Sequence, residues 1–113
     1  MAHLILHYRE AGMKNYVVIV RGKLKSKDEQ AAQKAHDEFV GMAAPMTKAA
    51  GAVSHHAHLN PQNRNEFMAI DVWNNMESPM KLFSDPKLAA GFNALFDGQP
   101  DISMWESTDW YSF

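Results

Sequence analysis

Cysteine is absent from all 113 residues of the chain. Its absence excludes disulfides, thiolate nucleophiles and zinc sites built on thiolates, and it fits a reducing cytoplasm. Long apolar runs are missing too, because no segment approaches the roughly 20 residues that cross a bilayer. The short apolar stretch 4–6 lacks the basic flank and the cleavage site of a signal peptide. We therefore expect a cytoplasmic protein that does not contact a membrane.

Excess charge is also small, with a formal net charge of −2 and no block of basic residues. Since a basic patch attracts phosphates, we expect no nucleic-acid partner. The hydrophobic content of 46% is typical of a globular protein, and the length accommodates one domain over residues 1–113. Met13 stands directly before the first convincing strand. We interpret residues 1–13 as an N-terminal extension and hypothesise that Met13 is the native start.

Hydrophobic periodicity divides the chain into alternating strands and helices. The β-branched run 17–20 predicts a buried strand. The expected strands span residues 16–24, 52–59, 66–73 and 102–111. One helix is expected between the first two strands. Between the last two, a short helix from Asn74 or Asn75 through residue 83 precedes a second helix, which begins at 84–86 and is stopped by Gly98 and Pro100.

The first helix carries its own start and stop signals. Ser26 and Glu29 have the spacing of a capping box, in which each side chain bonds a free amide of the first turn. Gly41 and Pro45 interrupt the helical run, so we expect a kink or a break there. Gly51 is expected to end the helix in the left-handed conformation.

The order strand, helix, strand, strand, helix, strand is the split βαβ pattern. It predicts an α+β, ferredoxin-like domain whose four-stranded antiparallel sheet has its helices on one face. Alternation along the third strand places Phe67, Asp71 and Trp73 on one face. The sequence does not fix which face forms a pocket, and we assign these three to the face away from the helices. Since a bare apolar sheet face must be covered, we expect a homodimer that closes a barrel.

Three segments, at 51–59, 67–73 and 82–88, resemble the antibiotic biosynthesis monooxygenase family. The third strand carries the acidic–X–Trp signature as Asp71-Val72-Trp73, where the family more often has glutamate first. The resemblance extends over roughly residues 14–111 and implies a dimeric α+β barrel. Active members of the family often oxidise phenolic or quinol-like compounds with molecular oxygen, without metal or flavin. Others degrade haem, isomerise small molecules or have no known activity.

No cofactor is expected. The proximal histidine of the haem-degrading relatives would fall near Gly91, which cannot bind iron. A glycine-rich phosphate loop is also absent from the sequence, so a nucleotide cofactor is not expected either.

The most distinctive polar feature is the group His55, His56 and His58 in the second predicted strand. His56 and His58 point to one face and His55 to the other. The pair can take a proton from a substrate, or hold a metal with Asp71 as a third ligand. It can also lie exposed on an edge strand without a ligand. We select His56, His58 and Asp71 as candidate catalytic residues, because imidazole takes up protons near neutral pH, and we predict no metal.

Candidate substrate-binding residues share the face of Asp71. Phe67 and Trp73 can stack on a flat aromatic compound, and Trp105 can share that wall. Asn74 can hold a carbonyl or an oxyanion. The leading hypothesis is a cofactor-independent monooxygenase acting on a small aromatic hydroxyl or quinol-type compound. The alternatives are a non-catalytic small-molecule-binding dimer of the same fold, or a different small enzyme such as an isomerase or lyase.

Overall fold

The computed structural model describes residues 14–113, so Met13 as a start and the extension 1–13 lie outside the described residues. Strands and helices follow one another in the predicted order. They are β1 (Tyr16–Leu24), α2 (Glu29–Ala49), β2 (Ala52–Asn60), β3 (Asn63–Trp73), α3 (Glu77–Leu82), α4 (Pro86–Leu95) and β4 (Phe96–Glu106). The sheet is antiparallel throughout, in the order β2-β3-β1-β4. This confirms the α+β, ferredoxin-like fold class.

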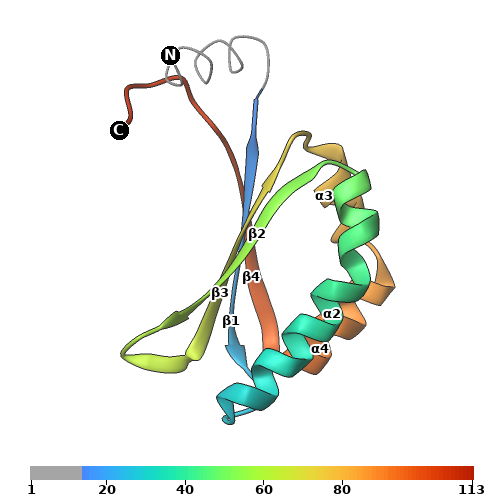
Figure 1. Cartoon of the computed structure of the whole chain (residues 1–113), viewed down its shortest axis with the longest axis vertical. Helices are drawn as coiled ribbons and strands as arrows, with labels where there is room; N and C mark the ends of the chain where they lie inside the picture. The colour runs from blue at the N-terminus through green and yellow to red at the C-terminus, as the bar shows by residue number, and fades with distance from the viewer. Residues whose placement is uncertain (1–13) are drawn as a thin grey trace.

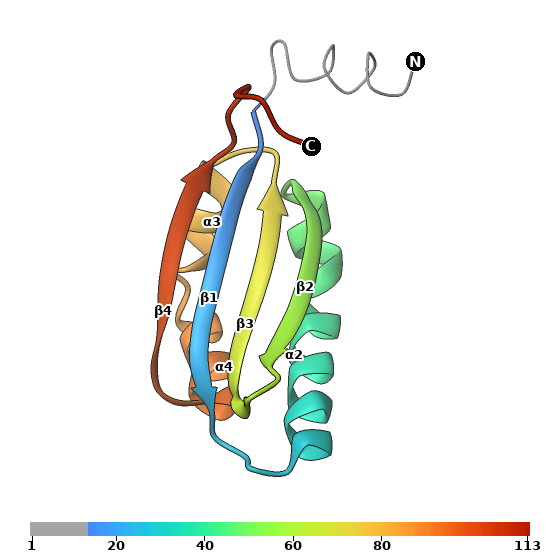
Figure 2. The same ribbon diagram turned by 90° about the vertical axis from the view of Figure 1, so that its left-hand side faces the viewer.

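The helices α2, α3 and α4 cover the same face of the sheet, and no other element within residues 14–113 covers the opposite face, called the bare face below (Figures 1 and 2). β1 occupies a central position because its β-branched residues suit a strand that is covered on one face and partly covered on the other. Val18 and Val20 point under the helices and are almost completely buried. Val17 and Ile19, which alternate with them, are half-buried on the bare face. The core therefore lies between β1, β3 and the helices.

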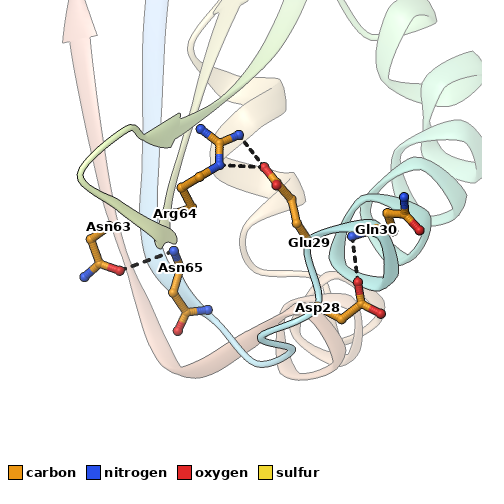
Figure 3. A network of polar contacts seen from close by, with 6 residues as sticks. All are labelled: Asp28, Glu29, Gln30, Asn63, Arg64 and Asn65. Carbon is orange, nitrogen blue, oxygen red and sulfur yellow. Dashed lines mark hydrogen bonds and ion pairs between the residues drawn. The ribbon is translucent and has the colours of Figure 1, made fainter.

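The start of α2 differs from the predicted capping box. The N-cap is Asp28, whose Oδ1 accepts a hydrogen bond from the backbone N–H of Gln30 at 3.0 Å. Ser26 accepts from the backbone N–H of Asp28 at 3.1 Å. Glu29 does not return to the helix start, because its Oε1 accepts a hydrogen bond from Nε of Arg64 at 3.0 Å (Figure 3). This bond and the charge of Glu29 raise the pKa of Arg64, and they tie the β2–β3 turn to α2.

The predicted break in α2 is wrong, since the helix runs through Gly41 and Pro45 without interruption. Proline removes the amide donor that would bond the carbonyl four residues earlier, here that of Gly41. Both residues are exposed, so water can satisfy that carbonyl. The predicted helix end is confirmed: Gly51 has φ +112°, and its carbonyl accepts a hydrogen bond from the N–H of Asn74 at 2.9 Å.

The last strand begins earlier than predicted, at Phe96, and ends at Glu106. Gly98 and Pro100 therefore lie inside β4 and do not stop a helix. The register of β4 against β1 shifts between Arg21 and Lys23, which pair with Asp101 and Asp97. The bulge in β4 therefore contains Gly98 and Pro100. Gly98 adopts φ +84° there. A proline is tolerated because β4 is an edge strand and one side of it needs no partner.

The assignment of Phe67, Asp71 and Trp73 to the bare face is wrong. In β3 they face the helices, where Phe67 is 7% and Trp73 3% exposed. The bare face is nevertheless apolar. Its half-buried residues from β1 and β3 are Val17, Ile19, Met68, Ile70 and Val72.

We predict that Gly51→Ala lowers the free energy of unfolding by about 1–3 kcal/mol, because a side chain there is strained at positive φ. The added Cβ would also lie 2.2 Å from Oδ1 of Asn74. Urea unfolding followed by circular dichroism, at fixed protein concentration, measures the change. The matched control is Gly41→Ala in exposed α2, where an added Cβ meets no described atom within 4 Å. It should raise the free energy of unfolding by about 0.5–1 kcal/mol, and equal effects of the two substitutions would contradict the prediction.

Candidate functional site

A cavity of about 350 Å³ lies between the sheet and the helices. It is lined by residues of the sheet, of α2 and α4, and of the end of α3. Its aromatic walls are formed by Phe39, Phe67, Trp73, Phe83, Phe92 and Phe96. Small residues of α2, Ala43 and Ala44, keep the helix side open. A cavity of this size and apolar lining suits a small aromatic ligand.

The polar residues that line the cavity are few and come from α2, β2 and β3. Among the described residues, its titratable lining residues are His36, Lys48, His55 and Asp71. His55 and Asp71 are direct partners across the β2–β3 ladder. Nδ1 of His55 lies 2.5 Å from Oδ1 of Asp71, and the two side chains are 30% and 19% exposed. A carboxylate that fixes an imidazole in this way is the arrangement that proton-transfer sites use.

His36 extends this pair toward the protein surface. Its Nε2 lies 2.9 Å from Nε2 of His55, and its Nδ1 lies 2.9 Å from Oδ1 of Asp37. Sequence reasoning missed His36, although a signal was present. His36 stands four residues after Ala32 and three before Phe39, so it occupies the apolar face of α2. A titratable residue on a buried helix face is a candidate for a functional role.

The structure separates His56 and His58 from the cavity. They alternate with His55 along β2, lie opposite Ile70 and Met68 in the ladder, and are exposed. Nδ1 of His58 lies 3.3 Å from the backbone carbonyl of Met68. Of the three predicted catalytic residues, only Asp71 lines the cavity. The histidine that contacts Asp71 is His55. Within residues 14–113, no three His, Asp or Glu side chains are grouped to hold a metal ion.

The predicted substrate-binding residues divide in the same way. Phe67 and Trp73 line the cavity. Trp105 does not, because it lies opposite Val17 on the bare face and is 59% exposed. Asn74 is exposed beyond the end of β3, where its Oδ1 accepts a hydrogen bond from the side-chain amide of Asn75 at 2.9 Å. Of the four predicted substrate-binding residues, Phe67 and Trp73 therefore lie together at the cavity.

Trp73 lines the cavity with its ring. Its indole Nε1 is fully buried and has no hydrogen-bond partner within residues 14–113. A buried donor without a partner costs about 1–3 kcal/mol. Because Nε1 is closed to the cavity as well as to solvent, a ligand in the cavity contacts the ring and not this N–H.

Comparisons with known proteins identify the architecture. No family model and no curated protein matches the chain. Among solved structures, one from Nitrosomonas europaea and one from Bordetella bronchiseptica are assigned as antibiotic biosynthesis monooxygenases. They align with TM-scores of 0.66 and 0.64 at 9% and 12% identity, over 87% and 83% of this chain and 94% and 97% of theirs. The chain has the antibiotic biosynthesis monooxygenase fold.

A third similar structure is a variant of SnoaB, described as a cofactor-independent oxygenase from Streptomyces nogalater. It aligns with a TM-score of 0.58 at 16% identity, over 87% of this chain and 95% of SnoaB. At such identities the likeness establishes the fold alone, and activity must be argued from the cavity. None of the helices in the described part of the chain has the length and apolar composition that a membrane crossing requires.

We predict that Ala43→Phe reduces the affinity of the cavity for 1-naphthol at least tenfold, about 1.4 kcal/mol, because the new ring occupies the space next to α2. Isothermal titration calorimetry with the full chain measures the affinity. The control is Ala49→Phe, which lies on the same helix, is exposed and does not line the cavity. If both variants bind 1-naphthol as the unmodified protein does, the ligand does not occupy this cavity.

Proposed function

We propose that the protein is a cofactor-independent monooxygenase that oxidises a small aromatic hydroxyl or quinol-type compound in the cavity. The observation that supports this most directly is the hydrogen-bonded pair of Asp71 and His55 at the wall of an otherwise apolar chamber. The fold shared with SnoaB, a protein described as a cofactor-independent oxygenase, is consistent with the same chemistry.

Asp71 is the proton acceptor in this proposal. Among the described residues its hydrogen bond is made through Oδ1, to His55, which leaves Oδ2 for a ligand. Removal of a proton converts the substrate into an anion, which gives electrons to dioxygen more readily than the neutral molecule does. His55 holds the carboxylate in place. Asp71 thus takes the base role that the sequence suggested first for His56 and His58.

The overall reaction balances without a further reductant. For an anthrone-like methylene, R₂CH₂ loses a proton to Asp71, and the anion combines with O₂ to give a peroxide anion. Asp71 returns the proton, which gives R₂CH–OOH. Loss of water, with cleavage of the O–O and remaining C–H bonds, leaves the ketone R₂C=O. The substrate carbon is oxidised by four electrons, all of which dioxygen accepts: one oxygen atom ends in the new C=O bond and the other leaves as water.

Trp73 binds the substrate through its ring. With Phe67 and Phe92, this ring forms an apolar wall on which a flat aromatic compound stacks. The substrate is therefore a flat aromatic compound with a proton that Asp71 can remove.

We predict that Asp71→Asn lowers the rate of oxygen uptake at least tenfold, about 1.4 kcal/mol of activation free energy. Asparagine keeps the shape of the side chain but cannot act as a base. The assay follows dissolved oxygen with metal-stripped protein and a panel of hydroquinones and anthrones. Glu38→Gln, at an exposed carboxylate of α2 outside the cavity, is the matched control.

Unchanged uptake in Asp71→Asn would exclude Asp71 as the base. No uptake by the unmodified protein, together with tight ligand binding, would instead favour the non-catalytic binding dimer.

The bare sheet face supports a homodimer as the working unit. Its half-buried aliphatic residues and the exposed ring of Trp105 would be covered by a second copy. With helices on one side and a partner on the other, both faces of the sheet are then protected from water.

We predict that light scattering at micromolar concentration gives twice the chain mass of 12.8 kDa. Ile70→Lys should give a single chain mass, because it buries an unpaired charge in the proposed interface. The control is Met42→Lys on α2, where the side chain is 84% exposed and the dimer should persist. A monomeric unmodified protein would refute the proposed homodimer.

A further inference from the structure

Four side chains form one continuous chain of polar contacts from the cavity to the surface. The order is Asp71, His55, His36 and Asp37, and the three joining distances are 2.5, 2.9 and 2.9 Å. Both nitrogens of each imidazole take part. The rings are nearly parallel, with centroids 5.1 Å apart and an interplanar angle of 20°. The two Nε2 atoms meet in the middle.

Each of the three contacts requires a proton. Carboxylate oxygens and unprotonated ring nitrogens carry only lone pairs, so two of them repel at these distances unless a proton lies between them. Three contacts need three protons, whereas two neutral imidazoles carry one each. When both carboxylates are ionised, the third proton gives the two rings together a single positive charge, held between Asp37 and Asp71.

The position of His36 gives this charge a route to solvent. His36 lines the cavity and also a separate groove on the outer side of the α2–β2 contact. Its side chain is 15% exposed, while that of Asp37 is 61% exposed. His36 therefore stands in the wall between the two spaces. A ligand in the cavity covers Asp71 and leaves the groove side of His36 in contact with water.

We propose that His36 and His55 share one proton between their Nε2 atoms, and that His36 thereby sets the protonation of the Asp71–His55 pair from the groove. The bond from Nε2–H of His36 keeps the remaining proton of His55 on Nδ1, where it donates to Asp71. His36 acts through His55 and is a positioning residue. In a single Asp–His pair the proton would be exchanged with the cavity. Here His36 exchanges its proton with water in the groove, outside the cavity.

The same three protons have a second arrangement. The proton on Nδ1 of His55 moves to Oδ1 of Asp71, and the proton on Nε2 of His36 moves to Nε2 of His55. Every hydrogen bond is kept and no heavy atom moves. Asp71 is then a neutral acid and His36 a neutral imidazole. The network can therefore present either a base or an acid to the cavity, while the change in charge appears at His36.

In the described part of the chain, few other titratable groups lie near the network. From the cavity side the remaining one is Lys48 of α2. From the groove side they are Glu29 of α2, which is paired with Arg64, and His58 of β2. The cavity-lining residues of α3, α4, β1 and β4 are all apolar. The charge on the two rings therefore depends mainly on Asp37 and Asp71.

The experiment is ¹⁵N nuclear magnetic resonance of the histidine rings in the full chain at neutral pH. We expect both Nδ1 atoms of His36 and His55 to be protonated, with one proton between their Nε2 atoms. His36→Gln retains an amide donor without a charge, so His55 should stay in the Nδ1–H form. His36→Leu removes the donor, so the ¹⁵N signal of Nε2 of His55 should move to that of an unprotonated nitrogen without a hydrogen bond, while the proton on Nδ1 stays with Asp71.

Two exposed neighbours on α2 separate a specific effect from a general charge effect. Asp37→Asn keeps a carbonyl acceptor for Nδ1 of His36 but removes the outer negative charge, so His36 should return to a neutral ring. Glu38→Gln removes a like charge one residue further along and should leave the signals of His36 and His55 unchanged. Circular dichroism verifies that each variant is folded. Unchanged His55 signals in folded His36→Leu, or one independent proton on each ring, would overturn the proposal.

The catalytic consequence of this network rests on the proposed monooxygenase function, whereas the proton arrangement does not. If the protein consumes oxygen, His36→Leu should lower kcat at least tenfold with KM within twofold, and His36→Gln should change the pH dependence of kcat. The expected ring signals without any oxygen uptake would refute the monooxygenase and keep the shared proton. Oxygen uptake with one independent proton on each ring would refute the shared proton and keep the monooxygenase.

Discussion

The register of β3 against β1 and β2 determines which face of the sheet each functional side chain occupies. Side chains alternate between faces along a strand, so a shift of one residue would move Asp71 and Trp73 out of the cavity together. The register is held where the buried face is best packed, with Val18 opposite Asp71 and Val20 opposite Ala69. The pairing that satisfies the core thus also brings Asp71 beside His55. The strand register therefore determines both the packing of the core and the position of the Asp71–His55 pair.

The cavity depends on how closely the helices approach one another. Gly91 of α4 lies against Phe39 of α2, and an added Cβ would be 2.3 Å from Cε1 of that ring. A glycine is therefore needed for the two helices to close over the cavity. The space remains because Ala43 and Ala44 follow Phe39 along α2 and project little into it. The close contact of Gly91 with Phe39 and the small side chains of Ala43 and Ala44 thus lie on the same stretch of α2 and together shape the cavity.

Much of the fold could be predicted from the sequence because strand and helix periodicities are strong in this chain. The face of the sheet could not, since alternation groups Phe67, Asp71 and Trp73 without saying where the helices lie. Which histidine lies beside Asp71 could not be predicted for a related reason. His56 and His58 share a face, but the partner of Asp71 is His55, and only the strand register shows this. His36 joins them from a helix 19 residues away in sequence, a contact that no local pattern contains.

The bulge in β4 has a consequence for the protein in a crowded solution. An edge strand exposes unpaired backbone groups on which another chain could build further sheet. Around Gly98 and Pro100 the strand is twisted away from a straight course and lacks one amide donor. A long run of backbone pairing cannot be extended past that point. The same irregularity that ended the predicted helix in the wrong place thus protects the monomer's open side from aggregation.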